Sequence, residues 1–166
     1  MTRWPGSPGY VSRVATDRAR LYHEVLAGYV RSGTAPHYLE IARRAGWEPD
    51  RAREVLHEVV GLGLPVWLHP GTDLVASFAP FSSLPTLYRI SVDDAAHGYA
   101  QCGLEALAVS WLFPGQQVQV DSLCLDCGQP ISLTMRDGQL LSISPEASVA
   151  HINVPVARWR GQYPLA

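Results

Sequence analysis

Residues 61–78, with the sequence GLGLPVWLHPGTDLVASF, mark the change from helical to strand periodicity in this chain of 166 residues. The opening Gly-Leu-Gly ends the helical pattern that precedes it. Two short apolar runs, residues 65–69 and 74–78, then flank the turn-forming sequence Pro-Gly-Thr-Asp. Apolar runs on either side of such a turn are typical of a β-hairpin. The stretch therefore predicts a helical region that ends in a hairpin.

Three helices are predicted upstream of the hairpin, because apolar residues recur there at helical spacing. The first covers residues 17–30 and ends at Ser32-Gly33. Thr34 caps the second, and Glu48-Pro49-Asp50 opens the third after a short turn at Gly46-Trp47. Three helices followed by a hairpin is the element order of a winged helix. We therefore predict a winged-helix-like region over residues 1–78.

A winged helix can bind DNA through its third helix, which here carries Arg51 and Arg53. The same helix carries acidic residues that would repel phosphates: Glu48, Asp50, Glu54 and Glu58. The whole chain has 13 basic and 15 acidic residues, for a formal net charge of -2. DNA is therefore not expected as a partner, although a transcriptional regulator or a soft-metal sensor is the alternative function.

Composition predicts a globular protein of the cytoplasm. Hydrophobic residues make up 47% of the chain, which is enough for a packed core. No apolar run approaches the roughly 18 residues of a membrane span, and the first residues lack an apolar signal core. Three cysteines cannot all pair, which favours a reducing compartment over a disulfide scaffold. We expect a monomer or a homodimer.

Residues 79–166 predict a second domain, a small mixed α/β core, so that the whole chain is of the α+β class. A central buried helix is predicted over residues 99–113, with Asp93 and Asp94 as capping residues before it. Strands are predicted around it over residues 87–92, 117–121, 131–135 and 140–143, and residues 149–156 can add one more.

Cys102 and Glu105 are the candidate catalytic residues. Because they lie three positions apart in the predicted helix, their thiol and carboxyl groups project from one face. A position near the start of a helix would stabilise the thiolate, so we expect Cys102 to be the most reactive thiol. A buried structural cysteine is the alternative. Glu105, however, lies among apolar residues, where an acid is costly unless it is hydrogen-bonded or protonated.

Cys124 and Cys127 form a Cys-x-x-Cys-Gly turn, which supplies half of the ligands of a zinc site. The chain has no second such pair, and His97 or His151 would have to complete the site. A structural turn with two spare thiols is the alternative interpretation. The sequence therefore leaves zinc at Cys124 and Cys127 as an open possibility.

The chain resembles the alkylmercury (organomercurial) lyases in three stretches, which together span about residues 74–147. These stretches are the Pro-Phe-Ser-Ser-Leu-Pro-Thr segment at 80–86, Tyr-Ala-Gln-Cys-Gly-Leu-Glu at 99–105, and the segment at 122–133 around Cys124. The resemblance implies a helical, winged-helix-like N-terminal region ahead of a catalytic α/β core. It also implies protonolytic cleavage of a carbon–mercury bond. Such a lyase requires no cofactor, and mercury belongs to its small organomercurial substrate and its product.

The resemblance assigns roles to individual residues. Cys102 matches the cysteine that takes up the organomercurial, and Glu105 occupies the place of the aspartate that carries a proton to the leaving carbon. Mercury is a soft metal that thiolates bind preferentially. Cys124 matches a further cysteine that we interpret as structural.

The sequence departs from the family pattern at two points. Glutamate replaces aspartate at position 105, which lengthens the side chain by one methylene. The family's second catalytic cysteine should fall near residues 153–156, but no cysteine follows Cys127. Cys127 or Cys124 could replace it, with Cys127 the expected helper, or a small thiol could do so. Activity could also be weak or redirected to another substrate.

Overall fold

The structure is a computed structural model that describes residues 8–150, with side chains from residue 16 onward. Helices α1 (Pro8–Ser32), α2 (Tyr38–Ala45) and α3 (Pro49–Val60) precede strands β1 (Val66–Leu68) and β2 (Val75–Phe78). The three helices and the hairpin therefore occur in the predicted order. No helix of the described residues is long and apolar enough to cross a membrane.

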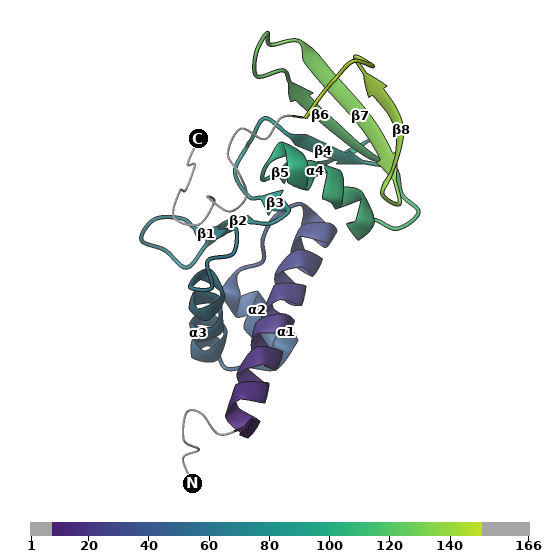
Figure 1. Ribbon diagram of the computed structural model, residues 1–166. Helices are drawn as coiled ribbons and strands as arrows, with labels where there is room; N and C mark the ends of the chain where they lie inside the picture. The colour runs from purple at the N-terminus through teal and green to yellow at the C-terminus, as the bar shows by residue number, and fades with distance from the viewer. Residues whose placement is uncertain (1–7, 151–166) are drawn as a thin grey trace.

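All strands of the described chain belong to one antiparallel sheet of eight strands, in the order β1-β2-β3-β5-β4-β6-β7-β8. The remaining strands are β3 (Phe81–Ser82), β4 (Arg89–Val92), β5 (Ala95–Ala100), β6 (Val118–Leu123), β7 (Pro130–Arg136) and β8 (Gln139–Ser144). Figure 1 shows the helices α1–α3 at one end of the molecule and strands β6–β8 at the other. The proposed domain boundary at residues 78 and 79 falls between β2 and β3, which pair with each other.

The prediction of one central buried helix over residues 99–113 is wrong. Asp93 and Asp94 adopt positive φ angles of 46° and 66° and form a two-residue turn that joins β4 to β5, with Val92 opposite Ala95. Aspartate tolerates this conformation, which suits hairpin turns. The helical part that follows is short, comprising α4 (Gly103–Ala108) and the 3-10 turn η1 (Val109–Leu112). Its Leu104 and Trp111 side chains are 50% and 68% exposed.

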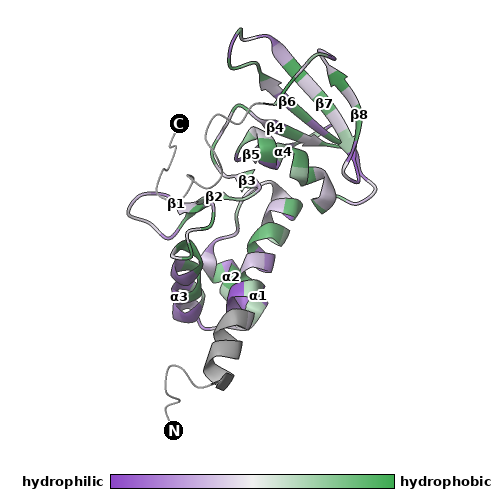
Figure 2. Ribbon diagram, viewed as in Figure 1, coloured by the Kyte–Doolittle hydropathy of each residue, from purple (hydrophilic) through white to green (hydrophobic). Residues whose placement is uncertain are grey.

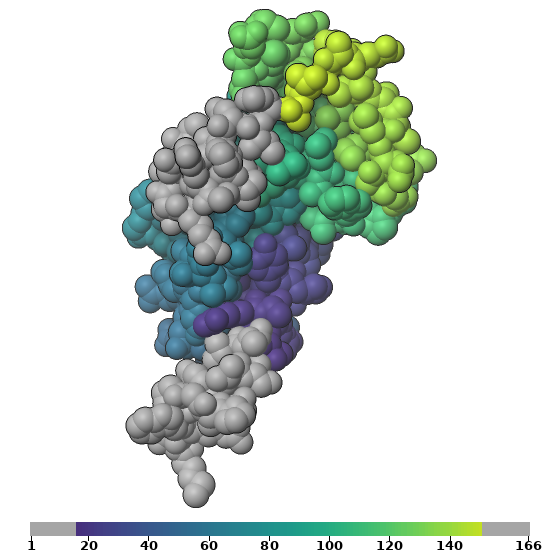
Figure 3. All heavy atoms as spheres, viewed as in Figure 1, coloured from purple at the N-terminus to yellow at the C-terminus, as the bar shows by residue number. Residues whose placement is uncertain are grey.

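Tyr29 of α1 connects the helical part of the chain to the sheet. Its side chain is fully buried, stacks on Phe81 with a centroid distance of 4.9 Å, and shares a hydrogen bond of 2.7 Å with Ser83 Oγ. The backbone oxygen of Tyr29 accepts a hydrogen bond of 2.8 Å from Nε2 of His97 in β5. Burial raises the pKa of the Tyr29 hydroxyl to about 12. One apolar core therefore extends from the helices into the sheet, and the two parts meet directly in Figure 3.

Ion pairs join α3 to the elements beside it. Arg51 binds Asp17 of α1 at 2.6 Å and Glu54 at 2.7 Å, and Arg18 binds Glu58 at 2.8 Å. Figure 2 shows the hydrophilic residues gathered along α3. The apolar side of this helix is buried and comprises Ala52, Val55, Leu56 and Val59. Amphipathic packing of this kind stabilises a helix of three turns.

Gly33 allows the end of α1 to approach β5 closely. It has a φ of 72°, and a Cβ atom built at this position would lie 1.9 Å from the backbone oxygen of His97. Gly46 also has a positive φ, of 64°, but a Cβ there would meet nothing within 4 Å. Comparing Gly33 with Gly46 separates the free-energy cost of the left-handed backbone conformation from the cost of the clash with the His97 backbone.

Replacing Gly33 by alanine should destabilise the protein more than the same change at Gly46. The left-handed conformation costs about 1–2 kcal/mol for alanine at either position. The clash with the His97 backbone should add about 1–3 kcal/mol at Gly33 alone. Urea unfolding of both variants measures the difference, and equal losses would contradict the close packing of α1 on β5.

Candidate active site

Strand β5 positions the backbone that leads into Cys102. Ala100 lies opposite Phe81 of β3, and its N–H donates a hydrogen bond of 2.9 Å to the Tyr88 oxygen on the other side. The Thr86 hydroxyl donates a hydrogen bond of 2.7 Å to the Ala100 oxygen. The 80–86 segment therefore holds the strand two residues before the candidate nucleophile.

Gln101 extends this hydrogen bonding to the residue next to Cys102. Its backbone N–H donates to the Pro80 oxygen at 2.9 Å. Its side-chain amide donates to Ser77 Oγ at 2.5 Å and to the Pro65 oxygen at 3.1 Å. Because both ends of the residue are fixed, the direction in which the chain enters α4 is fixed as well.

Cys102 is the residue that precedes α4, and it has an extended backbone with φ −150° and ψ 172°. Its oxygen accepts the first helical hydrogen bond, from the Ala106 N–H at 2.9 Å. Glu105 lies in the first turn, so the two side chains leave the same end of the helix. The thiol and the carboxyl group lie close enough for each to affect the pKa of the other. The structure thus brings the two predicted catalytic residues together.

The Glu105 carboxyl group lies in a partly apolar environment. Its Oε2 atom is buried and has no hydrogen-bond partner among the described residues. Burial raises the pKa of Glu105, and the hydrogen bond from Cys102 lowers it by a smaller amount. A carboxyl group in this setting accepts a proton more readily than an exposed one does.

The expectation that Cys102 is the most reactive thiol is not supported by its surroundings. Burial raises the pKa of the Cys102 thiol. The N–H groups of Glu105 and Leu104 act in the opposite direction, while the Glu105 carboxylate disfavours a second negative charge beside it. The protonated thiol is therefore favoured over the thiolate at Cys102.

Tyr22 of α1 is a neighbour of this site that the sequence did not indicate. Its ring lies 4.6 Å from that of Phe78, and its hydroxyl is close enough to Glu105 to be affected by the carboxylate charge. Burial and this charge both raise the pKa of Tyr22. At the sequence level Tyr22 is one more residue of an amphipathic helix, and nothing there distinguishes it.

Cys124 and Cys127 lie together in the turn between β6 and β7, as predicted, but apart from the first pair. The described residues contain no group of three or more His, Cys, Asp or Glu side chains that could hold a metal ion. The zinc site suggested by the sequence is therefore not supported. His97 donates instead to the Tyr29 oxygen and packs edge-on against Phe113. His151 lies outside the described residues.

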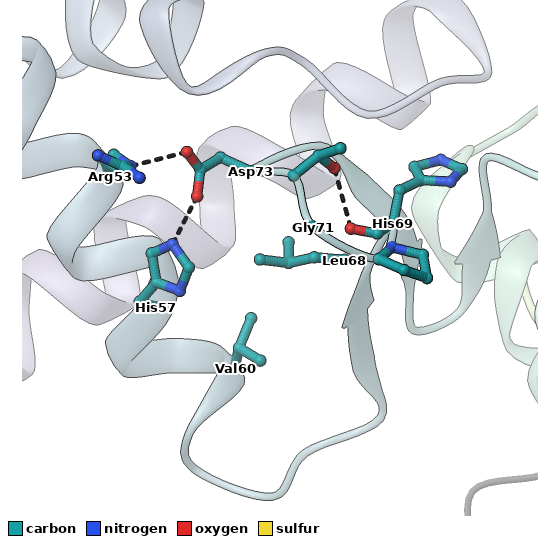
Figure 4. A pocket seen from close by; sticks show the side chains of 9 residues that line it. Arg53, His57, Val60, Leu68, His69, Gly71 and Asp73 are labelled. Atoms are coloured by element: carbon teal, nitrogen blue, oxygen red, sulfur yellow. Dashed lines mark hydrogen bonds and ion pairs between the residues drawn. The ribbon is translucent and has the colours of Figure 1, made fainter.

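A cavity of about 520 Å³ lies elsewhere, between α3 and the β1–β2 hairpin. Figure 4 shows Arg53 and His57 pointing from α3 toward Asp73, which they bind at 2.7 Å and 2.6 Å. The hydrogen bond from His57 is the main reason why the pKa of Asp73 is lowered. No cysteine lines this cavity. We therefore interpret the cluster as the contact that joins the hairpin to α3.

Comparison with known proteins identifies the family. The family model of MerB, alkylmercury lyase, matches residues 81–163, which is half of the chain. The chain belongs to the alkylmercury lyase family. The match covers β3 to β8 of this lyase family member and includes Cys102, Glu105, Cys124 and Cys127.

A solved structure supports the same fold for this member of the alkylmercury lyase family. Its title is "Crystal structure of the mercury-bound form of MerB2", and it superposes with a TM-score of 0.58 at 19% identity. The similarity covers 79% of this chain and 68% of that chain. No curated protein matches the chain.

Removing the Glu105 charge should make Cys102 easier to ionise. In a Cys124→Ser/Cys127→Ser background, the pH midpoint of Cys102 alkylation should lie above that of an ordinary cysteine, because burial disfavours the thiolate. Glu105→Gln should lower the midpoint, since the carboxylate opposes ionisation. Glu146→Gln, at an exposed acid, is the matched control and should leave it unchanged. A midpoint that does not move in Glu105→Gln would contradict the direct contact.

Proposed function

We propose that this protein cleaves carbon–mercury bonds of small organomercurials, with Cys102 binding the metal and Glu105 carrying the proton. The observation that carries the proposal is the contact between the Cys102 thiol and the Glu105 carboxyl group at the start of α4. One oxygen of this carboxyl group is buried without a hydrogen-bond partner among the described residues, so it is available to take up a proton. Membership in the alkylmercury lyase family supplies the reaction class.

The first step binds the substrate and moves one proton. The Cys102 sulfur forms a bond to mercury while the substrate's other ligand departs as an anion. The thiol proton passes to the neighbouring Glu105 carboxylate, whose pKa is raised by burial. The carboxyl group becomes neutral, which removes a charge from a partly buried position.

The second step makes the carbon basic enough to accept a proton. A mercury atom with one sulfur ligand and one carbon ligand needs further electron density, and an additional thiolate supplies it. Among the described residues, no second cysteine and no histidine joins Cys102 and Glu105 in a group of three that could hold a metal ion. We propose that a small cellular thiol provides the second sulfur ligand in place of the cysteine that is missing near residues 153–156.

The third step breaks the carbon–mercury bond. Glu105 donates its proton to the carbon, and the electron pair of the carbon–mercury bond becomes the new carbon–hydrogen bond. Mercury(II) remains bound to two sulfur atoms, and the Glu105 carboxylate is regenerated. No oxidation or reduction takes place. A positioned acid of this kind contributes about 10²–10⁴-fold to a rate.

Hydrocarbon release should depend on Cys102, on Glu105 and on added thiol. Cys102→Ser should abolish release, since a hydroxyl does not bind mercury as a thiolate does. Glu105→Gln should slow it by about 10²–10⁴-fold while organomercurial binding is retained. Glu105→Asp, with the same charge and a shorter side chain, should retain part of the rate. Gas chromatography of the hydrocarbon from a simple organomercurial measures all three.

The same assay contains the results that would overturn the proposal. Release that survives both Cys102→Ser and Glu105→Gln would exclude the mechanism. Absence of release from the unaltered protein at any thiol concentration would exclude the activity. Brisk release without added thiol, lost in Cys127→Ser, would show that Cys127 supplies the second sulfur.

We also propose that DNA is not a partner of the helical region. Arg51 is paired with Asp17 and Glu54, and Arg53 binds Asp73 at 2.7 Å, so both arginines are engaged within the chain. If these arginines bound DNA phosphates instead, acidic side chains on the same helix would lose their partners and would repel the phosphates. These contacts favour the enzyme over the alternative regulator.

A mobility-shift titration tests this part of the proposal. Duplex DNA should bind weakly, without sequence preference, and the binding should disappear as salt rises. Arg53→Ala should change little, because the arginine is already paired with Asp73. A tight complex at physiological salt that depends on DNA sequence would favour the regulator.

A further inference from the structure

The turn between β6 and β7 holds two thiols side by side in a defined backbone conformation. The Gly128 N–H donates to the Cys124 oxygen, and the Cys124 N–H donates to the Gln129 oxygen, both at 2.9 Å. Gly128 adopts a φ of 71°, which lets the chain reverse directly after Cys127. Cys124 is half-buried and Cys127 is exposed, so both thiols of this turn are accessible. The turn therefore presents two accessible thiols three residues apart on a backbone of defined conformation.

The backbone of this turn stabilises negative charge on Cys124. The nearby backbone N–H groups of Cys127 and Asp126, together with the Cys127 side chain, lower the pKa of Cys124. Thiolates are the form in which cysteine binds soft metals. Backbone N–H groups that stabilise a thiolate also hold a metal-bound sulfur in place.

The number of ligands in the turn selects the kind of metal. The described residues add no third His, Cys, Asp or Glu side chain to the two thiols, whereas tetrahedral zinc needs four ligands. Two thiolates are enough for mercury(II), which is soft and binds two sulfur ligands on opposite sides. Cys127 is exposed, so its side chain can rotate to the far side of the metal without displacing a packed neighbour.

The sheet brings this turn to the same end as the catalytic pair. Arg89 of β4 lies opposite Tyr99 of β5 on one side and Asp121 of β6 on the other, and both pairings are antiparallel. Strands β5 and β6 therefore run in the same direction. Cys102 lies three residues after Tyr99, and Cys124 lies three residues after Asp121. One strand separates them, which places the two strand ends about 10 Å apart across the sheet.

We propose that Cys124 and Cys127 form a second mercury(II) site, which takes over the metal that cleavage leaves on Cys102. In the exchange, two mercury–sulfur bonds form to the turn cysteines, and the bonds to Cys102 and to the small thiol break. The protons of Cys124 and Cys127 pass to the two departing sulfur atoms, so that Cys102 and the small thiol are both released as thiols. No electron transfer is needed. The handover rests on the proposed function, whereas mercury binding at the turn does not.

Mercury retention by Cys102→Ser protein tests the site without any turnover. The reduced protein receives one equivalent of mercury(II) chloride and excess small monothiol, is desalted, and is weighed by native mass spectrometry. One mercury per single chain is expected to remain. The double variants Cys102→Ser/Cys124→Ser and Cys102→Ser/Cys127→Ser serve as controls and should retain at least about tenfold less, because a lone thiol loses the chelate advantage. Circular dichroism of each variant checks that the fold is intact.

Three results would overturn the second site: no retention by Cys102→Ser, retention by the two double variants equal to that of Cys102→Ser, or mercury that bridges two chains. A separate experiment tests the transfer of mercury from Cys102 to the turn. After equal hydrocarbon release in the presence of monothiol, the unaltered protein should keep mercury through desalting and Cys127→Ser should not. Equal retention would exclude the handover. If only the lyase activity is absent, no hydrocarbon will be released, but the Cys102→Ser protein will still retain mercury. The failure of the proposed function can therefore be distinguished from the failure of the second mercury site.

Discussion

The contacts of Tyr29 hold together the parts of the chain that position the active site. This residue joins α1 to the 80–86 segment through Phe81 and Ser83, and joins α1 to β5 through His97. Strand β5 in turn leads directly into Cys102. A loss of packing at Tyr29 should therefore also disturb the strand that leads into Cys102 and Glu105. The helical region serves the enzyme as the support of its active strand.

The chemistry depends on the placement of one carboxyl group. Glu105 is held in the first turn of a short helix, beside a thiol, and its Oε2 atom has no hydrogen-bond partner among the described residues. Burial raises the pKa of both groups, which disfavours negative charge on either of them. In the proposed mechanism, mercury binding to sulfur releases the Cys102 proton and makes it available to the carbon. Surroundings that disfavour a free thiolate would then favour proton transfer once the metal is bound.

The sequence predicts those features of the fold that depend on local pattern. Helical periodicity and the turn residues after Leu68 give the helix–hairpin order, and the spacing of Cys102 and Glu105 places their side chains together. It fails at residues 95–100, because the Asp93-Asp94 turn and strand pairing with β4 override the helical pattern. It also misses Tyr22, whose proximity to Glu105 arises from the docking of α1. The order of the strands in the sheet decides which strand ends lie side by side, and local sequence patterns do not determine that order.

The central claim is that Glu105 takes up the Cys102 proton when an organomercurial binds. Infrared difference spectroscopy on binding of a simple organomercurial, in the absence of added thiol, observes this step before the carbon–mercury bond breaks. The account predicts a new band of a protonated carboxyl group in the unaltered protein, shifted in heavy water and absent in Glu105→Gln. A protonated-carboxyl band that persists in Glu105→Gln, or mercury binding to Cys102 without any such band, would contradict it.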